Sequence, residues 1–220
     1  VGIFLLLFNI WALVNILRQK DCSDIMLHVF RRRVLLLDAV AQFIVSNKWR
    51  KVVVLQGPLP GDADLAQSFQ RSAKRFGLKI VDTKPVKLGR DPRQRDRNNI
   101  ALLTSGKDYD VVFVADSEGE FARAVPYQTQ NPRPVVGSEG LVPDVWHWAW
   151  DRHGAPQLSI RFLRKAKRWM TAYDWSAWMA VKSIAEAVQR TGGTEFTAVK
   201  DYLKGTEIVL DGFKGYPLSF

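Results

Sequence analysis

Three of the chain's eight tryptophans stand at every second position of one short stretch, LVPDVWHWAWDRHG at 141–154. An indole has a flat apolar face for stacking and one N–H donor, so such a cluster suits a flat ligand, a packed core or a membrane interface. Asp144 and Asp151 bracket the cluster and no apolar span adjoins it, which argues against the membrane interface. Extended backbone after Pro143 would place all three indoles on one side: Trp146, Trp148 and Trp150.

The alternative to a stacking role is that the indoles pack this loop against the helix expected at 171–190. Ligand contact and core packing both stay open for Trp146, and Trp148 is the weaker ligand candidate. Trp150 is expected in the core. A flat ligand stacked on an indole could also carry acidic groups, which nearby basic side chains would bind through charge-assisted hydrogen bonds.

Other site chemistry finds little support in the sequence. His147 and His153 lie near two aspartates, but no HxxxH or HExxH spacing occurs, so we predict no metal site. The single cysteine, Cys22, excludes an intrachain disulfide and CxxC redox chemistry. No GxSxG, GxGxxG or phosphate-loop pattern is present. We therefore predict no catalytic residues and no required cofactor. An α/β enzyme with an unrecognised motif stays open as a third alternative, disfavoured because no nucleophile–base pair is recognisable.

The charge balance indicates an anionic partner or a solvated basic face. The formal net charge is +10 and the pI is about 9.9. Four basic residues share one helical face at i, i+3, i+4 and i+7 spacing: Arg161, Arg164, Lys165 and Arg168. Acidic residues are interleaved and no known nucleic-acid-binding pattern appears, so a solvated helix face fits better. A basic nucleic-acid-binding or regulatory module stays open as an alternative.

The elements that must position these residues alternate between strands and helices. Short β-branched or apolar runs predict strands at 25–30, 50–57, 78–83, 108–117 and 133–140. Apolar helical periodicity predicts helices between them, at 31–49, from an N-cap at Asp62 to Gly77, and at 118–128. This alternation predicts an α/β fold with a doubly wound, mostly parallel sheet, whose ligands would lie beyond the carboxyl ends of the strands.

The segment 171–220 predicts two helices followed by a hairpin or strand. Thr171 and Asp174 form a capping signature, and Gly192 and Gly193 end the helix that it begins. We expect this helix to bury Ala177, Val181, Ile184 and Val188. A second helix follows at 196–205 and a hairpin or strand at 212–220, while 87–99 is a surface loop. The apolar run at 1–17 fits a marginal membrane span or signal-peptide core, and equally a buried strand.

Several stretches, taken in order, resemble the substrate-binding proteins of ABC transporters with the type I periplasmic-binding fold, in the branched-chain amino acid group. The similarity is greatest to the subgroup associated with catabolism dependent on pyrroloquinoline quinone (PQQ). Among the stretches that carry it, from about residue 21 to 190, are DAVAQFIVSNKWRKVVVLQGPLPGD, DYDVVFVADSEGEF, PYQTQNPRPVVGSEGLVPDVWH and YDWSAWMAVKSIAEA.

The resemblance implies a non-enzymatic, monomeric periplasmic protein that closes two lobes on a small-molecule solute and delivers it to an inner-membrane permease. PQQ, a flat tricyclic tricarboxylate, is the candidate bound ligand, with a branched-chain amino acid or another small solute as the alternative. The implied ligand-binding residues are Arg33, Asp116, Ser117, Glu118, Ser138, Glu139, Trp146, Trp148 and Trp175.

We expect the chain to start within a longer protein, because it does not begin with Met. The resemblance then places the last strands of the N-terminal lobe and the hinge crossover in 1–30, and the C-terminal ligand-binding lobe in 31–170. A helix pair and a terminal strand at the hinge follow in 171–220. By this expectation the chain is mainly the C-terminal lobe, and the N-terminal lobe is largely missing. One departure from the subgroup is Arg31-Arg32-Arg33, where Pro-Ser-Arg would be expected.

Overall fold

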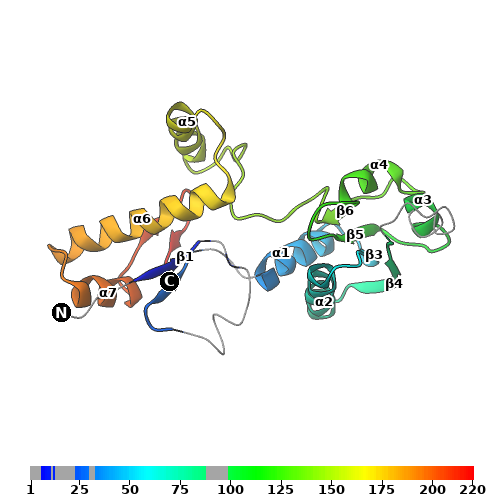
Figure 1. Cartoon of the computed structure of the whole chain (residues 1–220), viewed down its shortest axis with the longest axis horizontal. Helices are drawn as coiled ribbons and strands as arrows, with labels where there is room; N and C mark the ends of the chain where they lie inside the picture. Colours follow the sequence, from blue (N-terminus) through cyan, green and yellow to red (C-terminus); the bar gives the residue numbers. More distant parts are fainter. Residues whose placement is uncertain (1–5, 11, 13–22, 30–32, 88–98) are drawn as a thin grey trace. The chain divides into compact units, whose positions relative to one another are not determined.

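A computed structural model describes residues 6–10, 12, 23–29, 33–87 and 99–220. Contacts divide the chain into two compact units (Figure 1). Unit 2 is the continuous segment 33–143, and unit 1 combines 1–32 with 144–220. Unit 2 lies wholly within the lobe predicted at 31–170. Cys22 and most of the predicted loop at 87–99 lie outside the described residues.

Unit 2 is built on a four-stranded parallel sheet in the order β4-β3-β5-β6. Its strands are β3 (Lys51–Gln56), β4 (Lys79–Pro85), β5 (Val111–Ala115) and β6 (Val135–Gly137). Its helices are α1 (Arg33–Ser46), α2 (Pro60–Arg75), α3 (Ile100–Leu103), the short 3-10 helix η3 (Ala122–Ala124) and α4 (Val125–Gln128). The predicted α/β fold with a mostly parallel sheet is confirmed.

Both faces of this sheet are buried, which explains its continuous apolar runs. Successive residues of a strand point to opposite faces. Val52 and Val54 accordingly join the core formed with α1 and α2, while Val53 and Leu55 join a second core on the other face. On the α2 side, the rings of Phe69 and Phe113 stack with centroids 3.8 Å apart. Two cores of this kind hold the strand ends in fixed positions.

The predicted N-cap of α2 is wrong. The helix begins at Pro60 with Leu59 as its extended N-cap residue, and Asp62 is the third residue inside the helix. Its carboxylate accepts the Leu59 N–H at 3.0 Å. Proline suits the first helical position because its fixed φ is already helical and its missing N–H is not needed there. The helix therefore starts three residues earlier than the predicted N-cap at Asp62 indicated.

Unit 1 consists of short strands and three longer helices. β1 (Leu7–Asn9) and β2 (Met26–His28) pair in parallel, and β7 (Leu210–Asp211) and β8 (Pro217–Leu218) form an antiparallel hairpin, whose first strand lies just before the range predicted for a hairpin or strand, 212–220. The helices are α5 (Ala155–Ala166), α6 (Ala172–Thr191) and α7 (Phe196–Lys204). The predicted capping box of α6 is present, and Gly192 ends the helix in the left-handed conformation. No helix in the described ranges is long and apolar enough to cross a membrane.

The buried face of α6 differs from the predicted one. Val181 is 68% exposed and Ile184 is 40% exposed, although both belong to the stripe that we expected to be buried. The helix instead buries a face of mostly small side chains: Ala172, Trp175, Ser176, Met179, Ala180, Ser183 and Ala187. The hydroxyls of Ser176 and Ser183 donate to the carbonyls four residues earlier, at 2.9 and 2.7 Å, so their burial leaves no unpaired donor.

Candidate functional site

The strand order of unit 2 creates a switch point between β3 and β5. From β3 the chain crosses to β4 on one side, and β5 then lies on the other side of β3. In open parallel sheets, ligands bind outside the carboxyl ends of the strands at such a point. Here those ends carry Gln56 and Gly57 after β3, Asp116 and Ser117 after β5, and Ser138 after β6. We call this region the strand-end edge.

Asp62 ties the start of α2 to the end of β5. Its carboxylate is fully buried and accepts both the N–H and the hydroxyl of Ser117, each at 2.6 Å. A Cβ atom added to Gly61 would come within 2.8 Å of the Ser117 hydroxyl oxygen, so only glycine allows this approach. From the sequence, Asp62 was predicted only as a helix cap. Its position just after the strand-ending Gly57-Pro58 is the sequence signal for a role at the strand end.

Asp116 organises the loop that follows β5. Its buried carboxylate accepts the backbone N–H groups of Gly119, Phe121 and Ala122 at 2.8 to 2.9 Å. Burial acts to raise the pKa of Asp116, but the bonds from Ala122, Phe121 and Gly119 outweigh it and hold the pKa below its ordinary value. The Asp116 carboxylate thus fixes the loop, and the backbone N–H of Asp116 donates to the Ser138 hydroxyl at 2.9 Å.

Arg33 belongs to the same edge. It is the first residue of α1, and its guanidinium lies 3.9 Å from the Asp64 carboxylate in the first turns of α2. Glu118 is exposed and Glu139 is half-buried. Neither has a Lys or Arg within salt-bridge distance in the described part of the chain. The structure therefore joins Arg33, α2, Ser117, Asp116 and Ser138 through successive contacts.

The predicted tryptophans lie in unit 1, where two of them pack against each other. The rings of Trp146 and Trp175 are near-parallel, at 11°, with centroids 6.1 Å apart. Both are at least 95% buried. The Lys214 ammonium lies 5.2 Å from the Trp146 ring and 4.8 Å from the Trp175 ring, and it donates to the Val145 carbonyl. Lys214 was missed, since nothing in the sequence links it to a loop almost 70 positions earlier.

The three clustered indoles do not share one side. A turn at 148–149, with the Trp150 N–H donating to the His147 carbonyl at 3.0 Å, interrupts the expected extended backbone. Trp148 stacks on Trp169, with centroids 4.5 Å apart. Trp150 is 39% exposed, so its predicted place in the core is wrong, and Trp146 is the buried member instead. The loop packs on α6 through Trp146, which was the alternative interpretation.

Metal binding is not indicated by the arrangement of side chains. Within the described ranges, no group of three or more His, Cys, Asp or Glu side chains could hold a metal ion. Asp62 and Asp116, the two buried carboxylates of the strand-end edge, are each occupied by three hydrogen bonds from protein donors. The side chains of this edge that remain open to a ligand are those of Arg33, Ser117, Glu118, Ser138 and Glu139.

No protein-family model and no curated relative matches the sequence. The fold, however, matches solved structures. A branched-chain amino acid ABC transporter periplasmic ligand-binding protein from Burkholderia xenovorans LB400 aligns with a TM-score of 0.73 at 15% identity, over 94% of this chain and 59% of its own. A solute-binding protein of an ABC transporter from R. palustris, in complex with benzoate, aligns with a TM-score of 0.67 at 13% identity, over 96% of this chain and 65% of its own.

A third neighbour is the solute-binding protein of an ABC transporter from Rhodopseudomonas palustris BisB5, in complex with 3,4-dihydroxy benzoic acid. It aligns with a TM-score of 0.64 at 15% identity, over 96% of this chain and 62% of its own. The chain thus has the α/β fold of type I periplasmic binding proteins. It spans 59 to 65% of the length of these three proteins.

Proposed function

We propose that the protein is the solute-binding component of an ABC importer, and that it is not an enzyme. The observation that carries the proposal is the strand-end edge of unit 2. A switch point of a parallel sheet there brings together one guanidinium, two hydroxyls that form hydrogen bonds within the edge, and two carboxylates with no Lys or Arg within salt-bridge distance in the described residues. The carboxylates of Asp62 and Asp116, which each accept three hydrogen bonds from protein donors, hold this edge rigid, as a preformed binding site requires.

The first candidate ligand is PQQ or a related flat aromatic acid. Arg33 can form a bidentate pair with a ligand carboxylate, because its only ion pair in the described chain is the long contact to the exposed Asp64. Benzoate and 3,4-dihydroxybenzoate are the ligands of two fold neighbours, which makes an aromatic acid a reasonable class to test. The Ser138 hydroxyl accepts from the Asp116 N–H and would donate its own proton to a ligand carboxylate or hydroxyl. The Ser117 hydroxyl donates to Asp62, so it would only accept, from a ligand hydroxyl.

A second candidate, an amino acid, is favoured by the carboxylates of the same edge. Glu118 and Glu139 face no cation within salt-bridge distance in the described residues, and a ligand ammonium would satisfy them. An amino acid would then use Arg33 for its carboxylate and Glu118 or Glu139 for its ammonium. An aromatic acid would use Arg33 alone.

The remaining parts of the proposal follow from the class of protein. We propose a periplasmic location, a monomer that closes two lobes on its solute, and an inner-membrane permease as partner. PQQ enters only as a bound solute, and the proposal includes no metal and no nucleic acid. Trp146 and Trp175 are assigned to holding the loop on α6, because each covers a face of the other.

Isothermal titration of the full-length protein encoded by the gene, with PQQ, benzoate and leucine as separate probes, tests the proposal. Arg33→Gln should lower the affinity for any ligand bound through a carboxylate by roughly tenfold to a hundredfold, since a charge-assisted hydrogen bond contributes about 1.5–3 kcal/mol. The double variant Glu118→Gln, Glu139→Gln is the matched change at the same edge, because a ligand ammonium would use one of these two carboxylates. It should leave the affinity for an aromatic acid unchanged and lower the affinity for an amino acid by a similar factor.

The outcomes separate the candidates. Loss of binding in Arg33→Gln alone supports the aromatic acid, and loss in both variants supports the amino acid. If one of the probes binds but neither substitution changes its affinity, the strand-end edge is not the site. If none of the probes binds at millimolar concentration, the ligand assignment fails.

A further inference from the structure

The segment 145–170 of unit 1 concentrates the positive charge of the chain. It contains six Lys or Arg residues and one acidic residue, Asp151, which gives it a charge of +5 out of the chain's +10. The basic residues are Arg152, Arg161, Arg164, Lys165, Lys167 and Arg168. Only Arg168 forms an ion pair in the described residues, a two-point contact with Asp174 at 2.6 and 2.7 Å. The other five cations have no acidic partner within salt-bridge distance there.

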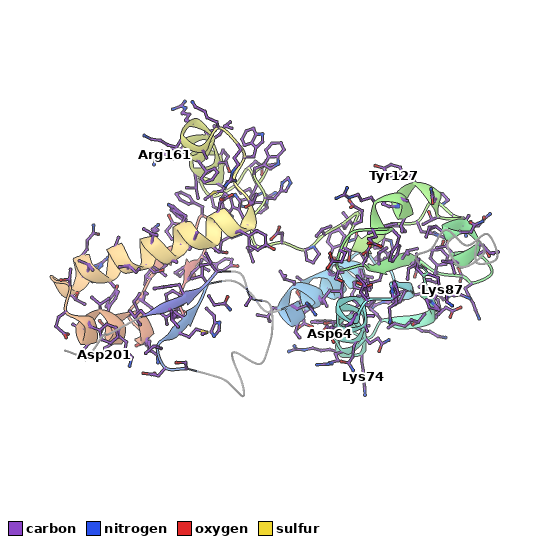
Figure 2. All side chains as sticks on the ribbon, viewed as in Figure 1. Asp64, Lys74, Lys87, Tyr127, Arg161 and Asp201 are labelled. Carbon is purple, nitrogen blue, oxygen red and sulfur yellow. The ribbon has the colours of Figure 1, made fainter. Side chains whose placement is uncertain are left out.

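Helix α5 directs three of these cations outward. Its buried residues are Ala155, Leu158 and Ser159. At 100° per residue, Arg164 lies opposite this buried face, Ile160 and Arg161 lie on either side of Arg164, and Lys165 lies at the margin of the buried face. All four are exposed, and Figure 2 shows Arg161 extending outward from α5. The basic stripe seen in the sequence is therefore a solvent-facing surface of one short helix.

Exposed indoles accompany this basic arc. Trp169 follows α5 and stacks on Trp148, with the two rings inclined by 24°. Trp148 is 43% exposed and Trp169 is 42% exposed. Trp150 and Ile160 are also among the exposed large hydrophobic residues. Solvated basic faces alone do not need large apolar side chains, and grouped exposed apolar residues mark interaction surfaces.

The residue that ends α5 is a lysine, Lys167, although its left-handed backbone conformation favours glycine. Lys167 caps the helix with φ of 59°, in the left-handed region that disfavours side chains. The backbone there is held by the Lys167 N–H donating to the Leu163 carbonyl at 2.9 Å. A lysine at this position adds to the positive surface next to Trp169.

We propose that segment 145–170 is a peripheral docking surface for an anionic lipid bilayer. Lys and Arg attract the lipid phosphates, while indoles and an aliphatic side chain enter the headgroup region. Nucleic acid is the less suitable partner, since bases stack on free indole faces. Trp148 and Trp169 already cover one face of each other, and Ile160 has no stacking role. The surface uses no residue of the strand-end edge, so it stands independently of the solute proposal.

Vesicle co-sedimentation of the full-length protein tests the docking surface. The probes are vesicles of phosphatidylcholine alone and of equal parts phosphatidylcholine and phosphatidylglycerol. The triple variant Arg161→Gln, Arg164→Gln, Lys165→Gln should lose roughly a hundredfold in partitioning to the anionic vesicles, since each basic residue near the surface contributes about fivefold. Trp148→Ala should lose roughly tenfold, because one large apolar side chain no longer enters the interface.

The matched control removes the same charge from unit 2: Lys74→Gln, Lys79→Gln and Lys107→Gln, all exposed in the parent. Anionic vesicle binding that survives in this control and is lost in the α5 variant supports the proposal. Equal loss in both triple variants would show a general charge effect and overturn it, as would no parental binding to either vesicle. Retention of single-stranded DNA without vesicle binding would assign the surface to nucleic acid instead. Solute affinity, measured separately, should not change in the α5 variant.

Discussion

Asp116→Asn tests whether a buried carboxylate holds the loop at the strand-end edge. In the parent, one carboxylate oxygen accepts the Gly119 N–H and the other accepts the N–H groups of Phe121 and Ala122. Asparagine has nearly the same shape but only one acceptor oxygen. That oxygen can serve two donors, and the amide NH₂ then faces the third N–H as a second donor.

The expected loss follows from these three bonds. Exchanging two charge-assisted bonds for neutral ones removes about 1 kcal/mol each, and the unpaired N–H costs about 1–3 kcal/mol. We therefore expect the free energy of unfolding to fall by about 3–5 kcal/mol, a large share of the roughly 5–15 kcal/mol of a typical domain. Urea unfolding followed by circular dichroism measures it, with an unchanged m-value as the check on two-state behaviour.

Asp201→Asn is the matched control, because Asp201 is exposed on α7. It should change stability by no more than about 0.5 kcal/mol. The Asp116 effect also depends on pH in a fixed direction. The lowered pKa of Asp116 means that its contribution is complete above the ordinary value of 3.8 and disappears as the pH falls through the folded-state pKa. The difference in the free energy of unfolding between the parent and Asp116→Asn should thus become smaller as the pH falls into the acid range. A loss below about 1 kcal/mol at neutral pH would refute the reasoning.

Two further predictions concern unit 1. Trp175→Phe should destabilise the protein by about 1–2 kcal/mol more than Trp146→Phe in urea unfolding. The Trp175 indole N–H donates to the buried Gly212 carbonyl at 3.1 Å, whereas the buried Trp146 N–H has no hydrogen-bond partner in the described structure. Equal losses would mean that the Gly212 bond contributes nothing. Hydrogen bonds from Lys200 and Lys204 lower the pKa of Asp24 to about 2, so a carboxyl NMR titration should find it there. In the double variant Lys200→Gln, Lys204→Gln the pKa of Asp24 should return toward 3.8. An unchanged titration midpoint would show that hydrogen bonds from the two lysines do not lower this pKa.

The fold was predictable because its signals are local and agree with one another. The β-branched runs at 50–57 and 108–117 admit no polar face, so they require a sheet covered on both sides, and the intervening periodic segments supply the cover. Thr171, Asp174 and Gly192 mark the ends of α6 because capping needs only neighbouring backbone. The placement of Asp116, Ser117 and Ser138 at strand ends followed from the same alternation.

Burial of individual side chains was decided by the tertiary structure. Trp146, Trp148 and Trp150 share one residue type and one spacing, yet the first is buried against Trp175, the second stacks on Trp169 and the third is 39% exposed. Contacts with residues distant in the sequence determine which of these indoles is buried. Likewise α6 buries serines and alanines and exposes Val181 and Ile184. Serine hydroxyls pair within the helix, so a face of small residues can be buried and hydrophobicity along the sequence does not identify it. The sequence by itself determined the alternation of the main strands and helices of unit 2 and the ends of α6, because those depend on local backbone chemistry. Packing between segments that are distant in the sequence determined which side chains each element buries.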